Sequence, residues 1–122
     1  MPFAKEALKR IRVLERKDPL RIVLEFLIKN AVGYSKAKPW RVIQRHLLKR
    51  GVRMTKNYFQ QTILSETRAG DIFIGSSNDG YFLICNKDDA RMMQEFYDTR
   101  IKAEQTHLDH LLSLASVEGW EL

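Results

Sequence analysis

Apolar side chains recur every three or four positions along most of this chain, which predicts amphipathic helices. The first two helices are expected over 3–16 and 19–30, because the Asp18-Pro19 pair supplies a cap and a favourable first turn. Gly33 is expected to close the second helix. A third helix is expected over 39–50, from Pro39 to Gly51. The positions predicted to face inward are Phe3, Ala7, Leu8, Ile11, Leu14, Leu20, Val23, Leu24, Leu27, Ile28, Ala31, Trp40, Ile43 and Leu47.

A fourth helix is expected from a Thr55 cap to about Arg68. Met54 before the cap and Phe59 inside the helix have the spacing of a hydrophobic staple. Phe59 and Ile63 are predicted to point into the core. The opposite, outer face is polar but not acidic, and is expected to hold Asn57, Gln60, Gln61, Leu64 and Arg68.

Two short β-branched and aromatic runs, 72–74 and 81–84, predict a hairpin with its turn over 75–80. Tyr81 and Phe82 are expected in the core. Asp88 is expected to cap a last helix that reaches about Ala115. This helix is long for a small domain, so we expect part of it to meet another surface. Its seam follows a 4-3-4-3 spacing with Glu104 at one polar position: Tyr97, Ile101, Leu108, Leu111 and Ala115.

Three helices followed by a hairpin resemble the winged-helix DNA-binding domains, especially those of regulators and accessory proteins of phages and mobile elements. In that resemblance KNYFQQTILSETRAG (56–70) is the recognition helix and DIFIGSSNDGYFLI (71–84) is the wing. The implied fold is mainly α with a small β-hairpin. A winged helix-turn-helix core over 19–85 is expected to lie between an N-terminal basic helix, 1–18, and a C-terminal helical extension, 86–122.

The charge is unevenly distributed along the 122 residues. Residues 1–56 hold 16 Lys/Arg against 4 Asp/Glu, whereas 57–122 hold 5 against 11. The basic half is expected to attract polyanions, although a merely solvated surface is the alternative. The length favours a single domain over 1–122. One cysteine and no apolar run long enough to span a membrane favour a cytoplasmic protein.

The polar face of the fourth helix suits the reading of bases in a major groove, because Asn and Gln pair with adenine. The base-reading candidates are Lys56, Asn57, Gln60 and Gln61. Hydroxyls and cations on flanking elements are expected to contact phosphates. These candidates are Lys38, Arg41, Arg45, Lys49, Arg53, Arg68, Ser76, Ser77 and Asn78. The predicted wing tip lacks Lys and Arg, and Asp79 opposes its deep entry into a minor groove.

No residues have the spacing of a catalytic or metal site, so we expect neither an enzyme nor a cofactor. His107 and His110 are three residues apart, but no thiolate or carboxylate completes a recognised zinc pattern. Cys85 follows an apolar run, where an inert, buried thiol is expected. His46 forms no triad that can be recognised from spacing.

The leading hypothesis is therefore a duplex-DNA-binding homodimer, a transcriptional regulator or a phage or plasmid accessory factor. Its dimer interface is expected at Tyr97, Ile101, Leu108 and Leu111. One alternative is a protein-interaction module, an assembly factor or phage-encoded inhibitor, that uses the acidic C-terminal helix. A second is a single-stranded nucleic-acid binder that uses Trp40 and Tyr34 near Lys36 and Lys38. Membrane binding by the basic first helix is disfavoured by its modest apolar face.

Overall fold

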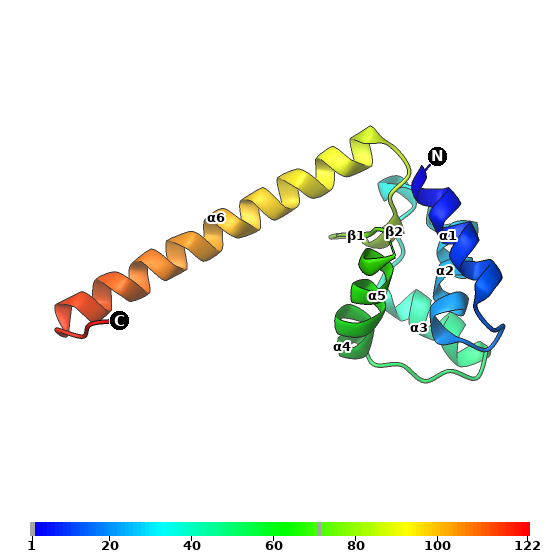
Figure 1. The fold of residues 1–122 in the computed structure, drawn as a ribbon, viewed down its shortest axis with the longest axis horizontal. Coiled ribbons are helices and arrows are strands. Elements are labelled where there is room, and N and C mark those ends of the chain that lie inside the picture. The colour runs from blue at the N-terminus through cyan, green and yellow to red at the C-terminus, as the bar shows by residue number, and fades with distance from the viewer. Residues whose placement is uncertain (1, 71) are drawn as a thin grey trace. The chain divides into compact units, whose positions relative to one another are not determined.

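The computed structural model describes residues 2–70 and 72–122, and its fold is mainly α with an antiparallel hairpin (Figure 1). The chain divides into two compact units, residues 1–90 and 91–122. The elements in chain order are α1 (Pro2–Val13), α2 (Pro19–Asn30), the 3₁₀ turn η1 (Tyr34–Lys36), α3 (Trp40–Lys49), α4 (Lys56–Tyr58), the π-helical turn η2 (Phe59–Ile63), α5 (Leu64–Ala69), β1 (Ile74–Ser77), β2 (Gly80–Leu83) and α6 (Lys87–Val117).

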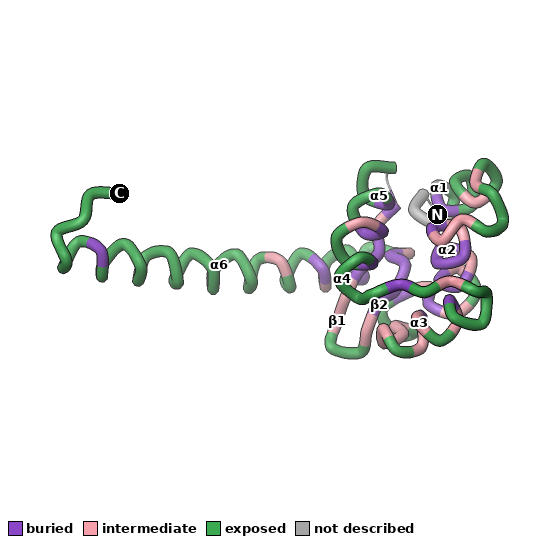
Figure 2. The backbone as a smooth tube through the Cα atoms, turned by 90° about the horizontal axis from the view of Figure 1, so that it is seen from below, coloured by how far each residue is buried: buried purple, intermediate pink, exposed green. Residues whose placement is uncertain are grey.

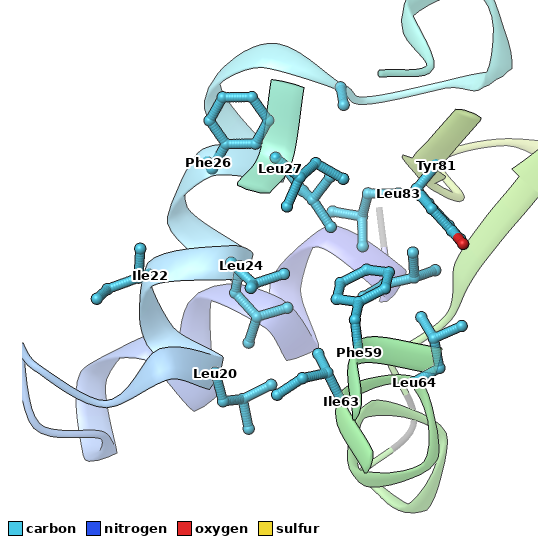
Figure 3. Close-up of a cluster of buried hydrophobic side chains, with 14 of the residues drawn as sticks. Leu20, Ile22, Leu24, Phe26, Leu27, Phe59, Ile63, Leu64, Tyr81 and Leu83 are labelled. Atoms are coloured by element: carbon cyan, nitrogen blue, oxygen red, sulfur yellow. The ribbon is translucent and has the colours of Figure 1, made fainter. Parts of the chain in front are cut away.

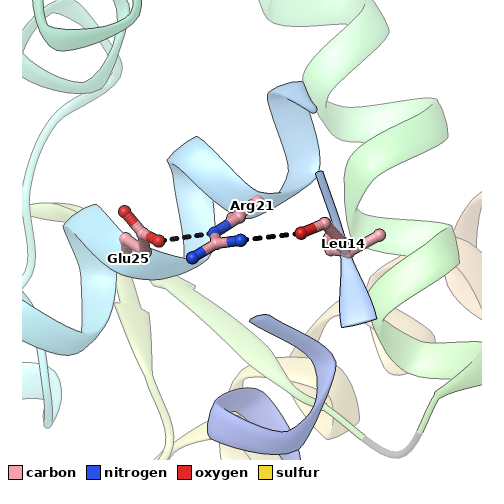
Figure 4. A network of polar contacts seen from close by, with 3 residues as sticks. All are labelled: Leu14, Arg21 and Glu25. Carbon is pink, nitrogen blue, oxygen red and sulfur yellow. Dashed lines mark hydrogen bonds and ion pairs between the residues drawn. The ribbon is translucent and has the colours of Figure 1, made fainter. Parts of the chain in front are cut away.

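The Asp18 cap and the side chain of Arg21 stabilise the connection between α1 and α2. Asp18 caps α2 as predicted, since its carboxylate accepts the Leu20 N–H at 2.9 Å. Arg21 donates to the Leu14 carbonyl and to Glu25, each at 2.7 Å (Figure 4). The Arg21 bond satisfies a carbonyl in the turn after α1, which ends at Val13 and therefore three residues earlier than predicted.

The inward face of α1 departs from the predicted apolar pattern. Leu8 was predicted to face the core, but it is exposed. Ala7 is fully buried, so the inward face of α1 is narrower than the apolar pattern suggested. The side chain of Phe3 lies outside the described residues.

The core of residues 1–90 is built from α2, α3, the α4–α5 segment and the hairpin (Figure 3). Phe59 is fully buried at its centre. Its ring centroid lies 4.9 Å from that of Trp40 and 4.8 Å from that of Tyr81. These contacts tie the start of α3, the fourth helix and β2 to one side chain, which fixes the fourth helix on the core.

The fourth helix contains a π turn that changes which residues it buries. The Leu64 N–H donates to the Phe59 carbonyl, five residues back, so one extra residue enters that turn. In an unbroken α-helix, Leu64 would lie about 140° around the axis from Phe59. The π turn brings Leu64 onto the buried face with Ile63. The prediction that Leu64 faces outward was therefore wrong.

The first strand lies further along the chain than predicted, over Ile74–Ser77 instead of 72–74, and the turn is tighter. Ile74 pairs with Leu83 and Ser77 with Gly80, which leaves only Asn78 and Asp79 as the turn. Ser76 and Ser77 are thus half-buried strand residues, not parts of a loop over 75–80.

The inner strand β2 is paired on both edges. Lys38 and Tyr81 exchange two backbone hydrogen bonds of 2.9 and 2.8 Å. The Gly33 N–H donates to the Leu83 carbonyl at 2.9 Å. Gly33, predicted to close α2, instead lies in this paired segment with a φ of 89°, and Ala31 caps the helix. The α2–α3 connection therefore anchors the hairpin.

Helix α6 begins at Lys87, two residues before the start that an Asp88 cap would give, and is capped by a different side chain. The Asn86 side chain accepts the Asp89 N–H at 2.9 Å, so Asn86, not Asp88, is the cap. At the other end Gly119 has a φ of 76°, and the Trp120 N–H donates to the Ala115 carbonyl at 2.9 Å. This is a Schellman ending, in which glycine accepts the left-handed conformation.

Candidate nucleic-acid interface

A polar surface follows the exposed side of the α4–η2–α5 helix, and we call it the polar helix face. Thr55 caps this helix, since its hydroxyl accepts the Tyr58 N–H at 3.0 Å. Phe59, Ile63, Leu64 and Thr67 are buried on the opposite side. The exposed polar residues of this helix, which define the polar helix face, are Lys56, Asn57, Tyr58, Gln60, Gln61, Ser65, Glu66 and Arg68. Figure 2 shows exposed positions along α4 and α5.

The structure further constrains Gln60, predicted to read bases, and Arg68, predicted to contact phosphate. The Gln60 amide donates to the Tyr81 hydroxyl at 2.9 Å, which directs it toward β2. Arg68, at the end of α5, has its guanidinium carbon 5.2 Å from the Phe73 ring centroid. Lys56, Asn57 and Gln61 are exposed and make the more accessible part of the face. These three side chains are therefore open to a partner surface.

Cationic side chains lie along the exposed side of α3, as predicted from their four-residue spacing. Arg41, Arg45 and Lys49 are exposed, while Ile43 and Leu47 are buried. Exposed cations aligned in this way suit contacts with a phosphate backbone.

One hydrogen bond shows which edge of α3 adjoins the start of α4. The Gln44 side chain donates to the Met54 carbonyl at 3.4 Å. Arg41 and Leu48, three and four residues from Gln44, lie along the same edge. A shallow groove between the two elements is lined by Gln44, Leu48, Met54, Thr55 and Arg53. Arg53, which is exposed, is thus placed beside the cap of the polar helix face.

The hairpin offers fewer groups than the sequence suggested. Asn78 and Asp79 are exposed at the turn. The Ser77 hydroxyl accepts the Asp79 N–H at 3.2 Å and lies 3.5 Å from the Gly80 carbonyl, so it supports the turn. Lys38 is half-buried, and its backbone is used in pairing with β2. Asp71, the first residue of the expected wing, lies outside the described residues.

A buried carboxylate locks the hairpin to the rest of residues 1–90. Asp89 is 1% exposed and accepts the N–H groups of Cys85 at 2.9 Å and Tyr34 at 3.1 Å. Burial, the strongest influence, acts to raise the pKa of Asp89, but hydrogen bonds from Cys85, Tyr34 and Asn86 outweigh it and lower that pKa. This role of Asp89 was not predicted from the sequence, although Asn86-x-x-Asp89 has the spacing of a capping box.

The nucleophilic and metal-ligating side chains do not converge. Burial raises the pKa of the Cys85 thiol, and so do its hydrogen bond to Asp89 and the charge of that carboxylate. Such a thiol is a weak nucleophile at neutral pH. Among the described residues, no three His, Cys, Asp or Glu side chains are grouped to hold a metal ion. His107 and His110 lie on exposed turns of α6.

Comparisons of the chain with known proteins found no matching family model, no matching curated protein and no matching solved structure. Within the described part of the chain, no helix combines the length and apolar character that crossing a bilayer requires.

Proposed function

We propose that this protein binds duplex DNA, with the polar helix face in the major groove and the cations of α3 on the phosphates. The observation that carries the proposal is the exposure of Lys56, Asn57 and Gln61 on a helix whose other side is fixed to the core by Phe59 and Ile63. Such a helix presents base-pairing groups in a defined orientation, which direct readout needs.

The arrangement of the elements supports a winged-helix interpretation. Helices α2, α3 and α4–α5 precede a hairpin whose inner strand also pairs with the α2–α3 connection. The exposed fourth helix corresponds to a recognition helix, and the hairpin to a wing. Strand β1 carries no charged residue, and Asp79 lies at the turn. Both features favour a wing that supports the fourth helix over a wing that enters the minor groove. A regulator or a phage or plasmid accessory factor fits this interpretation.

Single-strand binding is the less favoured of the nucleic-acid alternatives. Base stacking would use exposed aromatic rings next to cations. Trp40 is half-buried and packs on Phe59, so its ring is engaged in the core. Of the two aromatic side chains named for this alternative, Tyr34 is the exposed one, at 46%, and it is close in sequence to Lys36.

Fluorescence anisotropy with a labelled random duplex at several salt concentrations tests the proposal. With about six phosphate contacts, the logarithm of the affinity should fall with a slope near −5 against the logarithm of salt concentration. The same titration with a single strand of equal length should give weaker binding. Absence of duplex binding at low salt, or a preference for the single strand, would refute the proposed function.

Two substitutions separate base readout from phosphate contact. Gln61→Ala should reduce the preference for a selected site over random duplex by about 1–3 kcal/mol and change random-duplex affinity little. Arg45→Ala should weaken both by a similar factor and make the salt slope shallower by about one unit. Arg12→Ala, which removes the same charge from the exposed side of α1, is the matched control. Equal behaviour of the three variants would contradict the assigned roles.

A further inference from the structure

The C-terminal unit exposes an apolar seam that nothing within it covers. Residues 91–122 are described throughout and contain most of α6 and its short tail, with no second helix or strand. Ile101 is 64% exposed, Leu108 47% and Leu111 55%. Water exposure of such a seam is unfavourable, so a partner surface of matching length would stabilise it.

The spacing of the seam is that of a two-helix coiled coil. Gln94, Tyr97, Ile101, Glu104, Leu108 and Leu111 alternate at intervals of three and four residues. Beyond them Ala115 is 3% exposed, and its carbonyl accepts the Trp120 N–H where the chain turns back at the end of α6. The surface available to a partner helix therefore runs from Gln94 to Leu111.

Glu104 decides between the two orientations in which a second copy can pack. In a parallel pair each seam residue faces its own copy, which would place two Glu104 carboxylates together in the seam. Like charges at that separation repel. In an antiparallel pair the layers join Ile101 with Glu104, Tyr97 with Leu108, and Gln94 with Leu111. No carboxylate then faces a carboxylate.

The antiparallel arrangement also supplies Glu104 with a cation. Arg100 immediately precedes Ile101 and borders the seam on the side where Glu104 of the partner subunit would lie. The two-fold symmetry of the pair gives this contact twice. We propose that α6 associates with α6 of a second copy of this chain in an antiparallel pair, with Arg100 beside the partner's Glu104.

Light scattering or sedimentation tests the association without DNA, so its outcome is separate from that of the duplex titration. The full-length protein should be a dimer that dissociates on dilution, because the seam is short, about 26 Å by helix rise. Leu108→Glu should shift the species to monomer at concentrations where wild type is dimeric. Ser113→Glu, which adds the same charge on the opposite side of α6, should leave the dimer intact. A wild-type monomer at every concentration would overturn the proposal.

Disulfide trapping determines orientation and register. In a Cys85→Ser background, Gln94→Cys combined with Leu111→Cys should give covalent dimers on mild oxidation. Leu111→Cys alone should give none, because the two sulfurs would lie about 25 Å apart along an antiparallel pair. Efficient trapping by Leu111→Cys alone would show a parallel pair and refute the orientation. Stronger trapping by Ile101→Cys with Leu111→Cys would refute the register.

Discussion

At the scale of single residues, Asp89 in the first unit is a buried carboxylate that depends on hydrogen bonds from the backbone. It accepts backbone N–H groups from Cys85, four residues before it, and from Tyr34, 55 residues before it in the chain. The donors would lose their partner if the carboxylate were removed. Its neighbour Asp88 is exposed. The two adjacent aspartates therefore differ in what they contribute to stability.

Asp89→Ala should lower the free energy of unfolding by about 1–3 kcal/mol for each donor left without a partner in the interior. Asp88→Ala should change it by no more than about 0.5 kcal/mol. Urea denaturation followed by circular dichroism measures both. Similar values for the two variants would contradict the locking role of Asp89.

His46 gives the stability a dependence on pH near neutrality. Its ring packs 4.8 Å from that of Phe26. Burial first, and then the positive charges of Arg50, Lys49 and Lys29, lower the pKa of His46, against a small opposing effect of Glu25. The folded state thus binds a proton less readily than the unfolded state.

The stability that depends on neutral His46 should be fully present above the unfolded pKa of about 6.5 and decline as the pH falls below it. The decline should level off below the lowered pKa of the folded state. Urea midpoints between pH 7.5 and 5 measure this, and His46→Gln should flatten the curve in that range. A wild-type midpoint that rises on acidification through this range would contradict the assignment.

At the scale of elements, the hairpin depends on Gly80, where strand β2 comes close to the backbone of Lys38. A Cβ at Gly80 would lie 2.1 Å from the Lys38 carbonyl oxygen, and the φ of Gly80 is +125°. Gly51 also has a positive φ, +80°, but a Cβ there would meet nothing within 4 Å. Substituting each of these two glycines therefore separates the cost of a positive φ, which both share, from the cost of a steric clash, which only Gly80 has.

Gly80→Ala should destabilise the protein by at least about 1 kcal/mol more than Gly51→Ala, because only the first also separates β2 from the α2–α3 connection. Thermal and urea denaturation of the two variants provide the comparison. Equal losses of stability would show that β2 does not need this close approach.

The sequence predicted which elements exist better than how they end and turn. The helices were predicted from apolar spacing and from caps such as Asp18 and Thr55, which act locally and were confirmed. The π turn was missed because it depends on packing of Phe59 and Leu64 against the core, and a constant helical period cannot represent it. The tight turn at Asn78 was missed because the strands were predicted from apolar residues alone, whereas the paired part of β1 continues through Ser76 and Ser77.

The candidate interface was predictable only in part, for similar reasons. Exposure of Asn57 and Gln61 followed from their position opposite Phe59. The bond from Gln60 to Tyr81 links residues 21 apart and depends on where the hairpin packs. Apolar spacing predicts which face of a helix is exposed. Tertiary packing determines which side chains on that face already form hydrogen bonds with other elements.

At the scale of the whole molecule, the charge differs between the two units. Residues 1–90 carry 18 Lys/Arg against 9 Asp/Glu, and residues 91–122 carry 3 against 6. A phosphate backbone is therefore expected to associate with the first unit, and a helix partner with the second. The two proposals assign separate surfaces to the two partners, so each can fail without the other.

The central claim is that the polar helix face and the cationic side of α3 bind duplex DNA together. The most direct test is a ¹⁵N-resolved NMR titration of the full chain with a short duplex at low salt. The account predicts the largest changes in chemical shift at the backbone amides of Lys56, Asn57 and Gln61, with further changes at Arg41 and Arg45. Changes confined to α6, or none at saturating duplex, would contradict it.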